Sequence, residues 1–382
     1  MYSIAAYGSM LADDGRLAAY SAALRRAIRP ESVALDLGCG AGIMTVLACR
    51  LGARRVYAIE PDDVIQVARE IARANGCEER IVFIQDVSTR ATLPEPVDVI
   101  FSDLRGVLPL YQRHIPSVAD ARRRFLAPGG VLIPKQDTVW AVPVEAPQVF
   151  QRMRAGWETN GHGLDLKAGL RYAANAWRKE RVAREQFLAE PQRWAVLDYA
   201  AIEEANVSGD LAWTISRAGP GHGFLVWFDA ALAEGVGFSN APWEPELVYG
   251  SAFFPWSDAV PLVAGDTVTV HLAADLVAED YVWSWETRVL QGADPRRVKA
   301  GFRQSTFFGV PLSPEHLHRQ ASDHVPALNQ EGEIDRLAIS MMDGKSCLEE
   351  IARRLAQEFP GRFANWKEAL TRVGDLSQKY GR

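Results

Sequence analysis

The sequence predicts a parallel α/β domain in residues 1–145, an antiparallel β domain in residues 146–310 and a small helical domain in residues 311–382. In the first region, helical stretches alternate with short β-rich runs, namely "SVALDLG", "RRVYAIE", "RIVFIQD", "VDVIFSD" and "GGVLIP". Such alternation is typical of a parallel sheet covered by helices. In the second region, alternating β runs are separated by Gly, Pro and Asp turns, which indicates a barrel or sandwich.

Two helices of the first region have clear boundaries in the sequence. The helical run "RLAAYSAALRRAI" ends before Pro30. The run "DDVIQVAREIARANG" has Asp62 and Asp63 where a helix start favours them, and Gly76 where a helix end favours it. Ligands of such sheets bind beyond the carboxyl ends of the strands, so the residues that follow each β run form the candidate site.

Composition and charge argue against several classes of function. The 382 residues are 48% hydrophobic and carry a net charge of −6, which disfavours nucleic-acid binding. We expect no membrane span, because no run of about 20 apolar residues is present, and no signal peptide at the N-terminus. The four cysteines form no CxxC pair, so we expect free thiols, a cytoplasmic location and no metal site.

The stretch "LDLGCGAG", at the end of the first β run, suits a ligand that carries a nucleoside. Gly38, Gly40 and Gly42 allow a sharp turn that brings backbone N–H groups close to a ligand. Glu60 ends the next β run, about 20 residues after the turn, where a carboxylate can bind both ribose hydroxyls. Asp36 would repel a phosphate but attract an ammonium group. The pattern favours S-adenosylmethionine; the alternatives are a dinucleotide and a glycine turn needed only for packing.

From Tyr7 to Pro134 the sequence resembles the protein arginine methyltransferases. The resemblance rests on "ML" at Met10–Leu11, "DLGCGAGI", "GARRVYAIE", "VDVIFSD" and "LAPGGVLIP", and it continues in "GLDL", "GFSNAPWEP" and "FFPW". It implies a Rossmann-like class I methyltransferase domain, a β-barrel substrate domain and S-adenosylhomocysteine as the product. The segment before Met10 is shorter than in the family, which implies a reduced lid helix.

The resemblance also implies which residues bind the cofactor. Arg16 is expected at the cofactor carboxylate, Glu60 at the ribose, and the turn Asp86–Val87–Ser88 at the adenine. The full set of expected cofactor residues is Met10, Arg16, Asp36, Gly38, Cys39, Gly40, Gly42, Ile43, Glu60, Asp86, Val87 and Ser88.

The loop "SDLRGVLPLYQ", after the fourth β run, departs from the family. Two glutamates that grip a substrate guanidinium in the family correspond here to Asp103 and Gln112. Pro255 takes the place of a family histidine, whereas the adjacent Trp256 is retained. A guanidinium is always protonated and suits paired carboxylates, and removing one partner of a buried charge pair costs about 2–5 kcal/mol. Arginine is therefore a weaker candidate acceptor than the resemblance alone implies.

We assign Asp103 and Gln112 as the catalytic residues for a neutral or weakly polar acceptor, such as an imidazole, an amide, a hydroxyl or a protonated carboxyl. Asp103 would be a general base or an orienting hydrogen-bond acceptor. The alternatives are that Asp103 caps backbone N–H groups and that Gln112 is a solvated residue of the next helix. The residues assigned to substrate binding are Tyr7, Arg105, His114 and Trp256, with a surface position as the alternative for His114.

The second region contains a predicted helical interruption, "AANAWRKERVAREQFLAEP". By resemblance to the family, such an insertion reaches a partner's cofactor domain, which implies a homodimer; packing within one chain is the alternative. We expect most tryptophans of this region in the barrel core or rim, and the stretch Trp243–Trp256 as a candidate groove.

The third region is similar to the small winged-helix peptide-recognition domains typified by PqqD. The similarity rests on "MDGKSCLEEIARRLAQEFP" and a following helix. Ile351, Leu355 and Phe359 share one helical face, and Ser346 with Glu349 forms a predicted capping box. The similarity implies that the leader of a precursor peptide adds a strand to the domain edge. The alternative is a helical cap packed on the barrel.

The leading hypothesis is a methyltransferase that acts on a side chain of a peptide or protein, with a ribosomally made natural-product precursor as one candidate substrate. The first alternative is a protein arginine N-methyltransferase that tolerates the altered loop. The second is a scaffold that binds cofactor and peptide without transferring methyl groups.

Overall fold

The computed structural model describes residues 3–159 and 162–381. The chain divides into two compact units, Met1–Pro311 and Leu312–Arg382, and each is described by itself. None of the described helices is both long and apolar enough to cross a membrane.

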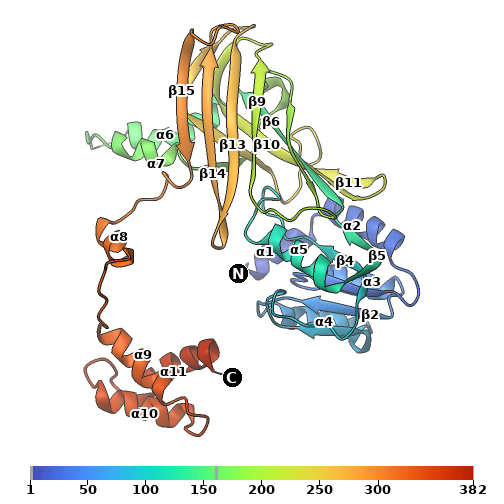
Figure 1. Cartoon of the computed structure of the whole chain (residues 1–382), viewed down its shortest axis with the longest axis vertical. Helices are drawn as coiled ribbons and strands as arrows, with labels where there is room; N and C mark the ends of the chain where they lie inside the picture. Colours follow the sequence, from blue (N-terminus) through green and yellow to red (C-terminus); the bar gives the residue numbers. More distant parts are fainter. Residues whose placement is uncertain (1–2, 160–161, 382) are drawn as a thin grey trace. The chain divides into compact units, whose positions relative to one another are not determined.

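The first unit begins with a five-stranded parallel sheet in the order β3-β2-β1-β4-β5 (Figure 1). Its strands are β1 Val33–Leu37, β2 Arg55–Ile59, β3 Ile81–Ile84, β4 Val97–Ser102 and β5 Leu126–Ile133. The helices of this part are α1 Ile4–Leu11, α2 Asp14–Ala27, α3 Ile43–Arg50, α4 Ile65–Ala74 and α5 His114–Phe125, with the short η1 Glu78–Arg80. All five predicted β runs form the strands of this sheet, so the predicted Rossmann-like fold is confirmed.

The strand order places the site between β1 and β4. The chain moves outward from β1 through β2 to β3 and then returns to lay β4 on the other side of β1. Leu37 at the end of β1 is the register partner of Ser102 at the end of β4. The glycine turn and the loop that begins at Asp103 therefore leave the sheet side by side, at the edge where such sheets bind ligands.

The rest of the first unit is antiparallel. One sheet has the order β7-β12-β10-β6-β8, with β11 paired to β10, and the other has the order β15-β14-β13-β9. The strands are β6 Gln136–Val144, β7 Arg178–Glu180, β8 Gln192–Asp198, β9 Val207–Thr214, β10 Gly219–Ala233, β11 Val236–Ser239, β12 Ser251–Leu262, β13 Thr267–Val277, β14 Asp280–Leu290 and β15 Val298–Ser305. Trp227, Trp256, Trp283 and Trp285 are buried here, whereas Trp243 is 45% exposed. The predicted antiparallel domain with an aromatic core is confirmed.

The predicted helix at residues 173–191 is wrong. Helices lie before it, as α6 Pro147–Glu158, η2 Lys167–Gly169 and α7 Leu170–Ala173, and only the short η3 Arg184–Gln186 lies within it. Residues 178–180 instead form β7, which pairs with residues 251–253 of β12. Phe187 and Leu188 are adjacent and both buried. Packing of consecutive side chains and strand pairing together outweigh the helical propensity of this stretch.

The second unit is helical in its described residues, 312–381, which contain no strand. Its helices are α8 Pro314–Gln320, α9 Gln330–Ser340, α10 Leu348–Glu358 and α11 Trp366–Tyr380. Ile351, Leu355 and Phe359 pack with residues of α9 and α11 in one core, as their spacing predicts. The capping box lies one residue later than predicted, because Glu350 accepts a hydrogen bond from the backbone N–H of Cys347 (2.8 Å).

Because these residues contain no strand, they offer no sheet edge to which a leader peptide could add a strand. This part of the prediction for residues 311–382 is not supported by the fold. A peptide that binds this unit would have to lie against helices.

Candidate active site

The turn between β1 and α3 requires its glycines. Gly38, Gly40 and Gly42 have φ of +77°, +50° and +81°, a region that other residues rarely adopt. A Cβ on Gly38 would lie 2.3 Å from a methyl carbon of Leu104, and a Cβ on Gly40 would lie 2.9 Å from the ring of Tyr7. The turn is therefore closely covered by the loop after β4 and by α1, and α3 starts directly after it at Ile43.

Glu60 holds the turn from the end of β2. One carboxylate oxygen accepts from the backbone N–H of Gly40 (3.0 Å) and the other from that of Asp62 (3.0 Å). The side chain is largely buried, and this burial raises the pKa of Glu60 above its usual value. The carboxylate is thus fixed next to the glycine turn before any ligand binds.

Asp36 lies beneath the same turn and is fully buried. Its Oδ2 accepts a hydrogen bond from the hydroxyl of Thr45 (2.5 Å), whereas Oδ1 has no hydrogen-bond partner. Burial, together with the nearby carboxylate of Glu60, raises the pKa of Asp36 to about 7, although Thr45 opposes the shift. A buried acceptor without a donor suits a ligand that brings an ammonium group, so Asp36 fits S-adenosylmethionine.

This pKa predicts that cofactor affinity rises with pH. If the ammonium group of the cofactor binds ionised Asp36, the proton on Asp36 must leave first. With a pKa of about 7, roughly a tenth of Asp36 is ionised at pH 6 and half at pH 7. We expect cofactor affinity to increase about fivefold over this interval, measured by isothermal titration calorimetry. An Asp36→Asn variant should bind more weakly and without this increase; an increase that persists in the variant would assign it to another group.

Protein stability depends on pH in the opposite direction: the contribution of Asp36 to the free energy of unfolding falls as the pH rises. The pKa of Asp36 in the folded protein lies above the ordinary value of an aspartate. Its stabilising contribution is complete below that ordinary value and is lost as the pH rises toward 7, because folding must then bind a proton to a carboxylate that is ionised in the unfolded chain.

Arg16 connects the cofactor side of the site to the acceptor loop. Its Nη1 donates to Asp103 Oδ2 (2.5 Å) and its Nη2 to the carbonyl of Met10 (2.7 Å). Its Nε is buried without a partner. The Nε–H group therefore remains for the expected cofactor carboxylate, while Nη1 donates to Asp103 and Nη2 donates to Met10.

The other expected cofactor residues surround the turn or follow β3. Cys39 is buried and donates its backbone N–H to Ile59 (3.0 Å). The carboxylate of Asp86 accepts from the backbone N–H of Val87 (2.7 Å), and the carbonyl of Ser88 accepts from Arg124 (3.1 Å). The predicted adenine-side turn therefore has a fixed backbone.

Asp103 is the centre of a buried charge network. By this name we mean Arg16, Tyr20, Asp103, Arg105, Asp137, Tyr199 and Tyr249. Asp103 accepts from Arg16, from Arg105 Nη1 (3.1 Å) and from the hydroxyl of Tyr249 (2.6 Å), and its side chain is only 6% exposed. Burial opposes ionisation of Asp103, but Arg105 and Arg16 hold its pKa below the usual range. The carboxylate is therefore ionised at neutral pH.

Asp137 and Tyr20 hold Arg105 in place within the network. Its Nε and Nη2 donate to the two oxygens of Asp137 (2.7 and 2.9 Å), and Nη1 also donates to the hydroxyl of Tyr20 (2.7 Å). The hydroxyl of Tyr199 donates to Asp137 as well (2.6 Å). We expected Arg105 to bind substrate, but its side chain is 0% exposed and the donors just named are committed within the chain.

The other members of the network were missed in the sequence. Asp137 lies in β6, Tyr249 two residues before β12, and Tyr20 in α2. One signal was available: Arg105 interrupts the apolar run "LRGVLPL". A charged residue inside a run that becomes buried requires a partner.

Gln112, which was assigned as catalytic, lies at the surface, and the predicted substrate residues His114 and Trp256 lie in the core. Gln112 is exposed, with a φ of +43°, in the turn before α5. His114 is buried: its Nδ1 lies 2.8 Å from the carbonyl of Pro109, and burial lowers its pKa to about 4. Trp256 is fully buried and stacks on Phe302. Neither His114 nor Trp256 presents a surface to a substrate in this structure.

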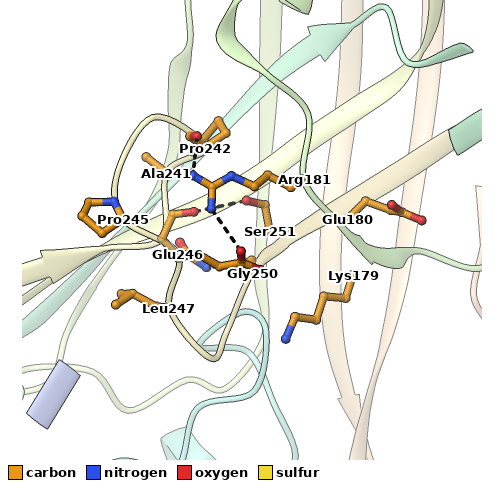
Figure 2. Close-up of a pocket in the computed structure, with 11 residues that line it drawn as sticks. Lys179, Glu180, Arg181, Ala241, Pro242, Pro245, Glu246, Leu247, Gly250 and Ser251 are labelled. Atoms are coloured by element: carbon orange, nitrogen blue, oxygen red, sulfur yellow. Dashed lines mark hydrogen bonds and ion pairs between the residues drawn. The ribbon is translucent and has the colours of Figure 1, made fainter. Parts of the chain in front are cut away.

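A surface pocket of about 230 Å³ is lined in part by Leu247 and Gly250, which lie close in sequence to Tyr249 of the network (Figure 2). Figure 2 shows Arg181 reaching to Pro242, whose carbonyl it contacts at 3.0 Å. The lining residues are Lys179, Glu180, Arg181, Asn240, Ala241, Pro242, Pro245, Glu246, Leu247, Gly250 and Ser251. Asn240 donates to the carbonyl of Val107 (3.2 Å), which ties the pocket to the loop after β4. The predicted groove stretch thus does form a pocket, although neither Trp243 nor Trp256 lines it.

Comparisons with known proteins find similarity to methyltransferases. The model of the ribosomal protein L11 methyltransferase (PrmA) family matches residues 20–140. The probable protein arginine N-methyltransferase 6 of Arabidopsis thaliana is 29% identical over 59% of this chain and 53% of its own length, so the match spans about half of that relative. Protein arginine N-methyltransferase 6 of Xenopus tropicalis is 29% identical over 64% of this chain and 78% of its own.

A solved structure shares the fold. The Trypanosoma brucei PRMT1 enzyme-prozyme heterotetrameric complex with AdoHcy contains a chain that matches 78% of this one and 96% of its own length, with a TM-score of 0.71 and 24% identity. The parallel sheet followed by an antiparallel domain is thus the architecture of a protein arginine methyltransferase. With the glycine turn, Glu60 and the unpartnered Asp36 oxygen, these findings indicate that the chain is a methyltransferase that uses S-adenosylmethionine and is similar to the protein arginine methyltransferases.

Proposed function

We propose that this chain transfers a methyl group from S-adenosylmethionine to a side chain of a peptide or protein that binds beside Asp103. The observation that carries the proposal is the pair of carboxylates at the glycine turn. Glu60 is held by the backbone of Gly40, and Asp36 offers a buried oxygen without a donor. A packing turn would need neither feature.

Some residues of the site would bind the cofactor, and Asp103 would contact the acceptor. When bound, S-adenosylmethionine would supply an electrophilic methyl group to a lone pair of the acceptor, with the C–S electron pair staying on sulfur and the N–H or O–H proton of the acceptor passing to solvent. Glu60 would bind the ribose hydroxyls, Asp36 the ammonium group and the Nε of Arg16 the carboxylate. Asp103 lies in the loop that covers the glycine turn, because its neighbour Leu104 touches Gly38.

The low pKa of Asp103 favours an orienting role over that of a general base. A carboxylate held ionised by two arginines is a weak proton acceptor near neutral pH. It can still accept a hydrogen bond from the acceptor side chain and align its lone pair. Gln112, which is exposed, would contact substrate only from the surface side of the loop.

The chain would have two kinds of binding partner, a second copy of itself and a peptide. Trp157 and Leu164 are exposed on the α6–α7 insertion, and this apolar exposure supports a homodimer formed through it. The helical unit Leu312–Arg382 would bind a peptide, such as a leader-bearing precursor, against helices rather than by strand addition. Arginine methylation and a non-catalytic scaffold are the alternative functions.

The test is methyl transfer with a labelled cofactor. The enzyme is incubated with S-adenosylmethionine that carries a trideuterated methyl group and with short peptides encoded beside its gene. Tandem mass spectrometry is expected to find the label on one residue, and Glu60→Ala should abolish it. Cofactor binding without label on any peptide or protein of the source lysate would contradict the proposal and favour the scaffold.

A further inference from the structure

We propose that the guanidinium of Arg105 pairs with the Asp103 carboxylate, which a substrate guanidinium would need. Arg105 thereby restricts the enzyme to uncharged acceptor side chains. This inference rests on the proposed function, because it names the substrate class of that same site. It makes Arg105 a positioning residue that sets specificity through Asp103.

The geometry around Asp103 leaves little room for a third cation. Its Oδ2 faces Arg16 at 2.5 Å and its Oδ1 faces Arg105 at 3.1 Å. The hydroxyl of Tyr249 reaches both oxygens, at 2.6 and 2.8 Å. A carboxylate offers about four lone-pair sites, so three donors already take most of them.

The charges of the network balance without a substrate. Arg16 and Arg105 contribute two positive charges, and Asp103 and Asp137 contribute two negative charges. A protonated guanidinium from a substrate would therefore enter a site with no uncompensated negative charge. An uncharged acceptor meets no such repulsion, and it can still donate a hydrogen bond to Asp103.

Arg105 cannot easily move aside. Its planar guanidinium forms the bidentate pair with Asp137, which is also fully buried. The rings of Phe228 and Phe238 lie 5.6 and 5.7 Å from its central carbon. Exchange of Arg105 for a substrate guanidinium would break these contacts, so the restriction is built into the folded chain.

The experiment compares two peptides that differ only in charge. Gly-Gly-Arg-Gly-Gly and its citrulline analogue are titrated into the full-length protein with S-adenosylhomocysteine bound. The wild type is expected to bind the citrulline peptide at least as tightly as the arginine peptide. In Arg105→Met the two buried carboxylates retain only one cation, Arg16, and the affinity ratio should shift toward arginine by about tenfold or more.

Two control variants separate specificity from general damage. Arg105→Lys retains the positive charge and should leave the ratio near the wild-type value. Arg54→Met removes the cation of an exposed ion pair with Glu95 (2.7 Å) and should also leave the affinity ratio near the wild-type value. If Arg105 had only a structural role, its replacement would weaken the binding of both peptides equally and leave the affinity ratio unchanged.

A wild-type preference for the arginine peptide of about tenfold would overturn the inference, and so would a folded Arg105→Met variant with an unchanged ratio. If Arg105→Met does not fold, the wild-type ratio decides. Methyl transfer by the wild type to the arginine peptide would refute the inference while establishing the proposed function. Absence of transfer to arginine, histidine, glutamine and serine peptides and to every peptide and protein of the source lysate would instead contradict the proposed function, and the affinity ratio would still decide the role of Arg105.

Discussion

Replacement of Glu60 by alanine is expected to weaken binding of S-adenosylmethionine by at least about two orders of magnitude. Each hydrogen bond to a charged acceptor contributes about 1.5–3 kcal/mol, and the carboxylate is expected to accept two from the ribose. The variant also loses the hydrogen bonds from the N–H groups of Gly40 and Asp62 that fix the turn. Isothermal titration calorimetry with the product, S-adenosylhomocysteine, measures the loss without turnover.

Glu95→Gln is the matched control for Glu60→Ala. Glu95 pairs with Arg54 at the surface, and its exposed ion pair should contribute little. We expect its cofactor affinity to stay within about twofold of the wild type. A Glu60→Ala affinity equally close to the wild type would remove Glu60 from the cofactor site and with it the main support for the proposed function.

The sheet and the cofactor side of the site could be predicted because their signals are local. Gly38, Gly40 and Gly42 follow a β run directly, and the positive φ at each explains why glycine is needed. Glu60 ends the next strand, and parallel pairing of β1 with β2 brings it to the turn. Sequence order and strand pairing thus suffice to assemble this half of the site.

The acceptor side could not be predicted, because its contacts join distant parts of the chain. Asp103 lies 87 residues from Arg16 and 146 from Tyr249, and nothing in their local sequence indicates those partners. Gln112 and His114 were placed by loop spacing, yet the turn before α5 leaves one exposed and buries the other. Side-chain direction in an irregular loop follows from tertiary packing, which a spacing pattern does not contain.

The same distinction explains the errors in the second half of the chain. Residues 173–191 have helix-forming composition, but β12 offers an unpaired edge that residues 178–180 fill. In the second unit, helical periodicity correctly predicted the buried face of α10. It was not informative about strands, and the winged-helix expectation depended on similarity alone.

Replacement of Asp137 by asparagine should lower the free energy of unfolding of the first unit by about 3–5 kcal/mol, because it leaves a buried cation without its bidentate partner. Asp137 and Arg105 are both 0% exposed, and Asp103 alone would then face Arg16 and Arg105. Denaturant unfolding, followed by the fluorescence of the buried tryptophans, measures the change as a shift of the midpoint at constant slope.

The double variant Arg105→Met/Asp137→Asn tests whether this loss comes from the unpaired charge. Removal of both partners leaves no unpaired cation or anion at this position, so the double variant should be more stable than Asp137→Asn alone. Glu95→Gln, which breaks an exposed pair, should cost less than about 1 kcal/mol. A loss in Asp137→Asn as small as that of Glu95→Gln would show that water or another group compensates Arg105. The guanidinium of Arg105 could then leave Asp103, and a charged acceptor side chain could pair with Asp103 instead.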